Sequence, residues 1–122
     1  TLVGVGGHFN GETYPLGYGK TVTVGRSREV DVSLKRTEVY RAQTPEQRDK
    51  DEAAQTVSGK HFQITMYNLR SIEIKNLSPN GTQLDGKAVE SVVIDDVTNK
   101  VHEIRFGLQE CFKLEMRIQP DA

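Results

Sequence analysis

Three short blocks of the sequence carry polar side chains that suit phosphate chemistry. They read GRS at residues 25–27, SGKH at residues 58–61 and SPNGT at residues 78–82. The guanidinium of Arg26 offers a rigid fork of donors for two phosphate oxygens, and the Ser58 hydroxyl can donate to a third. The Asn80 amide has both a donor and an acceptor, so it can hold a peptide main chain. If the three blocks meet in space, they indicate binding of a phosphate carried on a peptide.

The elements that must position these blocks are β-strands, because most of the chain alternates apolar and polar residues. The alternating runs are residues 21–24, 62–66, 72–75, 103–106 and 112–118. Turn signals separate the runs, and residues 78–81 place Ser, Pro, Asn and Gly in a favourable order for a β-turn. Many short strands between turns predict an all-β sandwich or barrel, in which strand ends and their loops gather at a rim.

Residues 35–57 break the alternating pattern. Thr44 fits the N-cap of a helix, Pro45 its first position, and Gln47 the third residue of a capping box. Residues 46–55 favour a helix but show no apolar stripe, so we expect a short, solvated helix within a long, mobile loop. A loop of this length in a compact domain is usually functional or disordered.

Together, the three polar blocks resemble the signature blocks of the forkhead-associated (FHA) family, in the family's order and at strand ends. The resemblance covers nearly the whole chain and implies an FHA-like (SMAD/FHA) β-sandwich of about eleven strands. It implies one FHA domain over residues 1–122, with a long, partly helical insertion loop at about residues 35–57. The family reads phosphothreonine peptides through loops at one end of the sandwich.

Residue by residue, the resemblance implies that Arg26 and Ser58 contact the phosphate and that Asn80 holds the peptide main chain. Four further positions match residues that shape the binding loops, and these are Gly25, His61, Gly81 and Thr82. His61 is then a structural, hydrogen-bonding histidine rather than a base.

The sequence also departs from the family pattern beside the expected site. Gly59 lacks a side chain where family members often carry a phosphate or peptide ligand, and Pro79 stands where some members have a hydroxyl residue. The accessory candidates that could compensate or contribute are Lys60, Ser27, Thr56, Arg28, Lys35, Arg36 and Arg41. The 35–57 segment runs beside the expected site, so it either sets the preference for residues flanking the phosphothreonine or acts as a spacer.

Net charge and cysteine content limit the kinds of partner and the cellular compartment that we expect for this protein. The net charge of the 122 residues is −1, which argues against bulk binding to nucleic acid or membranes. Cys111 is the only cysteine, so no internal disulfide can form, and we expect a core thiol in an intracellular protein, cytoplasmic or nuclear. The chain begins at Thr1 rather than Met, and we interpret it as part of a larger polypeptide.

Other chemical signals are weak. The Gly19-Lys20-Thr21 sequence lacks the earlier glycine of a phosphate-binding loop, and a strand rather than a helix follows it. The three histidines lie far apart in sequence, and none pairs with Cys111 at a metal-ligand spacing. We therefore expect no metal, no cofactor, no catalytic residues and no enzymatic activity.

The sequence thus predicts a phosphothreonine-dependent peptide- or protein-binding module that mediates interactions in kinase signalling. Its partner would be a phosphothreonine-containing segment of another protein. The alternative is a phospho-independent scaffold or oligomerisation domain on the same fold. An unrecognised enzyme or a nucleic-acid binder is disfavoured by the missing catalytic groups and the near-neutral charge.

Overall fold

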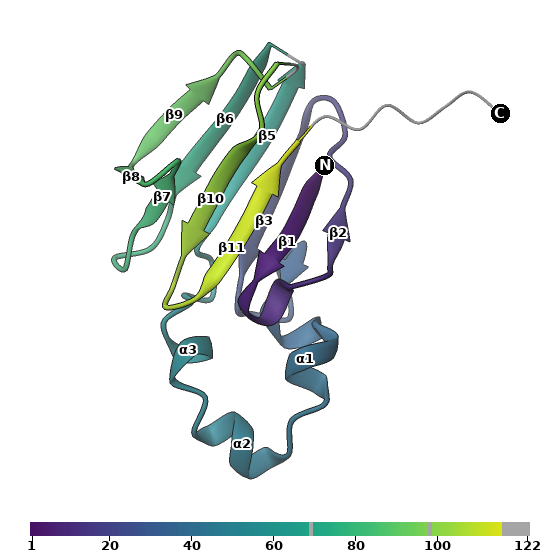
Figure 1. Cartoon of the computed structure of the whole chain (residues 1–122), viewed down its shortest axis with the longest axis vertical. Coiled ribbons are helices and arrows are strands. Elements are labelled where there is room, and N and C mark those ends of the chain that lie inside the picture. The colour runs from purple at the N-terminus through teal and green to yellow at the C-terminus, as the bar shows by residue number, and fades with distance from the viewer. Residues whose placement is uncertain (69, 98, 116–122) are drawn as a thin grey trace, which may run out of the picture.

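Two β-sheets pack face to face in the computed structural model, which describes residues 1–68, 70–97 and 99–115 (Figure 1). The six-stranded sheet has the order β2 (Thr13–Tyr14), β1 (Leu2–Gly6), β11 (Glu110–Leu114), β10 (His102–Phe106), β7 (Thr82–Leu84) and β8 (Lys87–Val89). The five-stranded sheet has the order β4 (Val32–Ser33), β3 (Lys20–Gly25), β5 (Phe62–Asn68), β6 (Ser71–Asn76) and β9 (Ser91–Ile94). The expected all-β sandwich of about eleven strands is confirmed.

Strand register explains why the alternating runs form this core. In the five-stranded sheet, Ile64 lies opposite Val22 on one side and Ile74 on the other, so the apolar residues share the inward face. Aromatic rings fill the space between the sheets: Phe106 stacks on Phe112 with ring centroids 5.8 Å apart and meets Phe62 edge-on. The predicted continuation of the last run through Met116 and Ile118 lies outside the described residues.

Cys111 is buried, as expected, but on the outer side of its sheet. It lies opposite Arg105 in the pairing of β10 with β11, whereas the adjacent Phe112 points into the core. Its side chain instead lies against Gly6. Burial raises the pKa of the Cys111 thiol, which disfavours the reactive thiolate.

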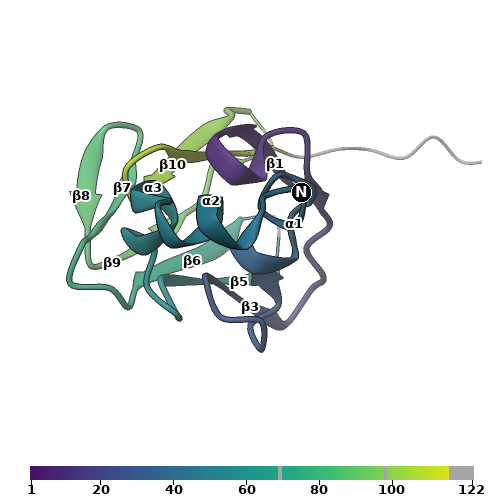
Figure 2. The ribbon, with the colours of Figure 1, turned by 90° about the horizontal axis from the view of Figure 1, so that it is seen from below.

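A helical segment projects from one end of the sandwich, and Figure 2 shows its helices spread across that end. It comprises η2 (Leu34–Arg36), α1 (Glu38–Arg41), α2 (Pro45–Asp49) and α3 (Glu52–Gln55). The capping box predicted at Thr44 is present, with hydrogen bonds in both directions between Thr44 and Gln47. A long helical insertion is not confirmed, however, because α2 ends at Asp49 and Asp51 caps a separate helix.

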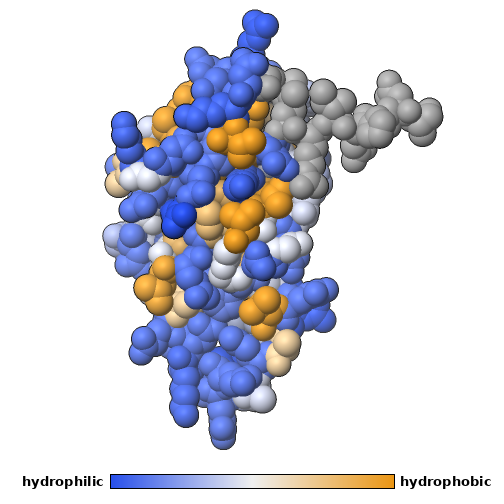
Figure 3. Space-filling model, viewed as in Figure 1, coloured by the Kyte–Doolittle hydropathy of each residue, from blue (hydrophilic) through white to orange (hydrophobic). Residues whose placement is uncertain are grey.

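The helical segment is attached mainly at its two ends. Neither α1 nor α2 contains a buried residue, and hydrophilic side chains cover most of this end on the face that Figure 3 shows. Leu34 at the start and Ala54 and Val57 at the finish belong to the hydrophobic core. Short helices with little apolar contact depend on neighbouring polar contacts for their position. None of the helices within the described part of the chain is long and apolar enough to cross a membrane.

Candidate functional site

Backbone pairing brings the first two polar blocks together. The Arg26 amide donates to the Ser58 carbonyl at 2.9 Å, and the Ser27 amide donates to the Gly59 carbonyl at 3.2 Å. Gly25 permits this approach, because a Cβ at that position would lie 2.1 Å from the Gly59 carbonyl oxygen. The requirement for glycine at position 25 is therefore steric.

The third block joins the second through two hydroxyl groups. The Oγ atoms of Ser58 and Ser78 lie 2.6 Å apart, and Ser78 Oγ also accepts a hydrogen bond from the backbone amide of Asn80 at 3.1 Å. The β-turn predicted over residues 78–81 is present, with the Gly81 amide donating to the Ser78 carbonyl and a positive φ of 83° at Gly81. We refer to residues 25–27, 58–61 and 78–82 together as the rim.

Asn76 supports the turn and was not singled out from the sequence. Its side-chain amide donates to the Ser78 carbonyl, and its Oδ1 accepts the Ser78 amide and the Thr82 hydroxyl. An Asn followed two residues later by a turn-initiating Ser is a recognisable signal for such a side-chain turn. The loop-shaping role expected for Thr82 thus has a physical basis in its hydrogen bond to Asn76.

His61 ties the second block to the third from beneath. It is fully buried, its Nδ1 accepts the Ser58 amide at 3.0 Å, and its Nε2 donates to the Gly81 carbonyl at 2.8 Å. This pattern defines a neutral ring with its proton on Nε2, since an amide can only donate and a carbonyl can only accept. Burial lowers the pKa of His61, so the ring stays neutral at physiological pH.

The end of α3 lies against the rim, as expected for the 35–57 segment. The Asn80 side-chain amide donates to the Thr56 carbonyl at 2.9 Å. Thr56 Oγ1 accepts the Leu108 amide at 2.7 Å from the turn between β10 and β11. A surface hollow beside this junction is lined by Asn80, Leu108 and neighbouring residues of both turns. Thr56 therefore holds Asn80 and the β10–β11 turn in one arrangement.

The cationic side chains near the rim differ in how they are engaged. No hydrogen bond or ion pair occupies the Arg26 guanidinium or the Lys60 ammonium group within the described part of the chain. Arg36, in contrast, donates to the carbonyls of Val30 and Asp31, so it serves its own loop. Ser27 Oγ accepts the Glu29 amide at 3.2 Å. Arg26 and Lys60, which lie in the rim, therefore remain available for a ligand. The same holds for the other cationic candidates Arg28, Lys35 and Arg41, whose side chains form no hydrogen bond or ion pair among the described residues.

The other two histidines do not assemble with the rim. His8 and His102 each lie between two carboxylates, in two separate places. Among the described residues, no group of His, Cys, Asp and Glu has an arrangement that could hold a metal ion.

Known proteins share this fold and its sequence pattern. The FHA domain of an Arabidopsis thaliana hypothetical protein is 25% identical, covers 99% of this chain and 87% of its own, and superposes with a TM-score of 0.69. The FHA domain of Chlamydia trachomatis CT664 protein is 19% identical over 95% and 96% of the two chains, with a TM-score of 0.66.

The N-terminal FHA domain of S. cerevisiae Rad53p, solved in complex with a phosphothreonine peptide, is 22% identical over 80% and 68% of the two chains, with a TM-score of 0.54. A comparison with curated proteins gave no match. The sequence profile described as the FHA domain matches residues 22–107, which is well over half of the chain. The protein therefore belongs to the FHA domain family.

Proposed function

We propose that this FHA domain binds phosphothreonine-containing segments of partner proteins through the rim. The observation that carries the proposal is the position of Arg26, whose backbone is hydrogen-bonded to Ser58 and whose guanidinium has no ion pair among the described residues. A dianionic phosphoryl group on a partner would complete this site by bidentate pairing with the guanidinium.

The neighbouring groups suit the remaining parts of such a ligand. Ser58 Oγ is hydrogen-bonded to Ser78 Oγ in the free protein, and the Ser58 hydroxyl can rotate to donate its own proton to a phosphate oxygen. Asn80 is exposed, and its side chain is already oriented by Thr56, so its amide oxygen is available to a peptide N–H. The Rad53p FHA domain, which shares this fold, binds a phosphothreonine peptide, and this supports the same ligand class here.

Binding of an oriented peptide library centred on phosphothreonine tests the proposal, with phosphoserine and unphosphorylated libraries as controls. We expect binding only to the phosphothreonine library. Equal binding to phosphorylated and unphosphorylated libraries would instead favour a phospho-independent scaffold.

The Arg26→Ala variant tests the assignment of the phosphate site. Removing one member of a desolvated charge pair costs about 2 to 5 kcal/mol, or roughly thirtyfold to several thousandfold in Kd. Arg70→Ala is the matched control, because Arg70 is an exposed arginine in the turn between β5 and β6, at the other end of β5 from the rim, so we expect no loss. Unchanged phosphopeptide affinity in Arg26→Ala would show that the phosphate site lies elsewhere.

A further inference from the structure

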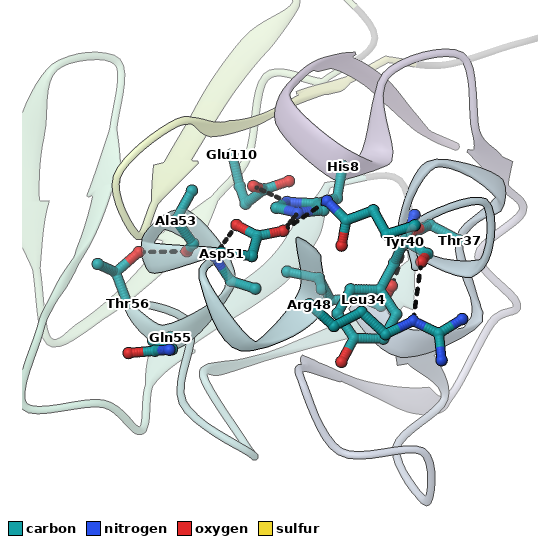
Figure 4. Close-up of polar contacts among 12 residues, drawn as sticks. His8, Leu34, Thr37, Tyr40, Arg48, Asp51, Ala53, Gln55, Thr56 and Glu110 are labelled. Atoms are coloured by element: carbon teal, nitrogen blue, oxygen red, sulfur yellow. Dashed lines mark hydrogen bonds and ion pairs between the residues drawn. The ribbon is translucent and has the colours of Figure 1, made fainter. Parts of the chain in front are cut away.

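A buried cluster of three ionisable side chains joins the helical segment to the six-stranded sheet (Figure 4). His8, from the short helix η1 (Gly7–Phe9), lies between the carboxylates of Asp51 and Glu110. Its Nε2 is 2.6 Å from Asp51 Oδ2, and its Nδ1 is 2.9 Å from Glu110 Oε2. We call these three residues the His8 cluster. It connects three elements that are distant in sequence: η1, the N-cap of α3 and the start of β11.

With both carboxylates ionised, the geometry makes His8 a cation. Both ring nitrogens face carboxylate oxygens, and an ionised carboxylate can only accept, so both nitrogens carry protons. The hydrogen bond to Glu110 raises the pKa of His8, and Asp51 raises it further, against the opposing effect of burial. The side chains of His8 and Glu110 are almost fully enclosed, and that of Asp51 is only 9% exposed.

The other polar and aromatic side chains around the cluster supply no further charged partner for His8. From α1, the Tyr40 ring lies 6.3 Å from the His8 ring, and the Arg48 guanidinium sits over that Tyr40 ring rather than against a carboxylate. Gln43 donates to the same Asp51 oxygen that His8 contacts. The charged partners that face His8 are therefore Asp51 from the helical segment and Glu110 from the sheet.

A short chain of contacts leads from the cluster to the rim. Asp51 Oδ1 accepts the Ala54 amide and thereby caps α3. The C-cap of the helix is Thr56, whose carbonyl accepts from the Asn80 side chain and whose hydroxyl accepts from the Leu108 amide. One helical turn advances about 5.4 Å, so Asp51 and the rim contacts of Thr56 lie at opposite ends of the same small unit.

We propose that His8, Asp51 and Glu110 are positioning residues for peptide recognition, which fix α3 so that Thr56 holds Asn80 in its binding orientation. This inference rests on the proposed function of the rim. Apolar contacts of Ala54 and Val57 with the core retain the end of the segment when the cluster is broken. Loss of the cluster therefore frees the N-cap of α3, so that Thr56 can shift about these two contacts without unfolding of the sandwich.

A second histidine that lies between two carboxylates supplies a matched control. His102 lies between Asp85 and Asp96, with both nitrogen–oxygen distances 2.6 Å. It is at the start of β10, whereas Phe106 at the other end of that strand pairs with Thr82 of the rim. At about 3.3 Å per residue, four residues of strand place His102 roughly 13 Å farther from the rim. It has the chemistry of His8 without the connection to Thr56.

The first experiment compares Asp51→Asn, His8→Gln and His102→Gln by their Kd for a labelled phosphothreonine peptide selected from the oriented library. Asparagine can still cap α3 but removes the charge that holds His8. We expect Asp51→Asn and His8→Gln to weaken binding about fivefold or more, a usual size for coupling between sites. His102→Gln should bind within about twofold of the wild type. Wild-type Kd values in both His8 cluster variants, with thermal unfolding still cooperative, would overturn the inference.

The second experiment is the pH profile of the same Kd between pH 7 and 9, where the phosphate is already dianionic because its second pKa is about 6. The pKa of His8 is raised, so the stabilisation by its contacts is complete below pH 6.5. This stabilisation is lost as pH rises through the pKa that His8 has in the folded protein. We expect affinity to fall with rising pH in the wild type and in His102→Gln, but not in His8→Gln. A merely structural role would leave all three profiles parallel, and that result would overturn the inference.

A measurement without peptide separates this inference from the proposed function. The Asn80 side-chain amide and the Leu108 backbone amide can be followed by NMR during the same pH titration, since both donate to Thr56. Their resonances should shift with one apparent pKa in the wild type and not in His8→Gln. Such shifts without any phosphopeptide binding would refute the proposed function alone, whereas peptide binding without shifts would refute the His8 cluster as a positioning device.

Discussion

His61 and His8 are both buried within one end of the same domain, yet their environments give them different charge states. His61 bridges a backbone amide and a backbone carbonyl, which fixes a neutral ring. His8 bridges two carboxylates, which fixes a charged ring. Burial alone therefore does not determine the protonation of a histidine, and the partner of each nitrogen decides it.

The two environments also give opposite dependences of stability on pH. The pKa of His61 is lowered, so its contribution to stability is complete above pH 6.5. That contribution is lost as pH falls through the pKa that His61 has in the folded protein. The pKa of His8 is raised, so its contribution to stability is complete below pH 6.5. That contribution is lost as pH rises through the pKa that His8 has in the folded protein. These two residues together favour a stability maximum near pH 6.5, with the rim limiting it on the acid side and the His8 cluster on the alkaline side.

Replacing His61 by alanine should break this comparison most severely. The change removes a buried ring that packs 5.2 Å from the Phe106 ring and leaves the Ser58 amide and Gly81 carbonyl without a partner. We expect the free energy of unfolding to fall by about 4 kcal/mol, from the cavity and the unpaired groups together. Urea denaturation at pH 7.5 and 8.5 measures it, and the loss should be equal at both values because His61 is already neutral there.

His102→Ala provides the reference for that loss. Its partners Asp85 and Asp96 have side chains that are 33% and 45% exposed, so water can replace much of the lost contact. We expect a loss of about 1 kcal/mol, as is usual for partly solvated contacts. Equal losses in the two variants would mean that His61 does not bridge the rim.

The Glu110→Gln variant should have a smaller effect that, unlike the His61 effect, depends on pH. Glu110 accepts from His8 and from the Phe9 amide, and one amide oxygen cannot replace both acceptors. We expect a loss of about 2 to 3 kcal/mol at pH 6, where His8 is charged and loses a buried counter-ion. The loss should be smaller at pH 9, because the wild-type contact is itself lost as pH rises through the raised pKa of His8.

Chemical denaturation at the two pH values measures this difference, with Glu29→Gln as the control. Glu29 is exposed and forms no ion pair among the described residues, so its replacement should change stability by less than about 0.5 kcal/mol at either pH. A Glu110→Gln loss that does not change with pH would indicate that His8 is neutral in the folded protein.

The contrast between His61 and His8 also shows what the sequence could predict. Strand alternation specified the sandwich, because one buried face imposes a period of two on every strand. The rim followed from local blocks whose turn chemistry is self-contained, such as the Ser78 to Gly81 turn. These features depend on residues that are neighbours in the chain or on a pattern that repeats within it.

The His8 cluster depends on contacts that no local pattern contains. His8 lies 43 residues from Asp51 and 102 residues from Glu110, and no repeat or motif links these positions. The division of the helical segment into α2 and α3 has a local cause, the Asp51 cap, within residues 46–55 that are otherwise rich in helix formers. The contact between Asp51 and His8 is consistent with a helix N-cap at Asp51, and helix propensity alone does not encode this long-range contact.

Gly59 offers the smallest test, one that changes the rim and leaves the His8 cluster untouched. A Cβ built at Gly59 meets only the Ser27 Cβ, at 3.9 Å, whereas one at Gly25 would collide with the Gly59 carbonyl. Gly59→Ser should therefore be tolerated and add one hydroxyl ligand for phosphate, tightening phosphopeptide binding by about 1 kcal/mol, or roughly fivefold. Gly59→Ala, measured by the same fluorescence titration, adds the Cβ without the hydroxyl and should give no gain. If alanine tightened binding as much as serine, the gain would come from a stiffer loop rather than from a new phosphate ligand, and the rim would share the dependence on positioning that we assign to the His8 cluster.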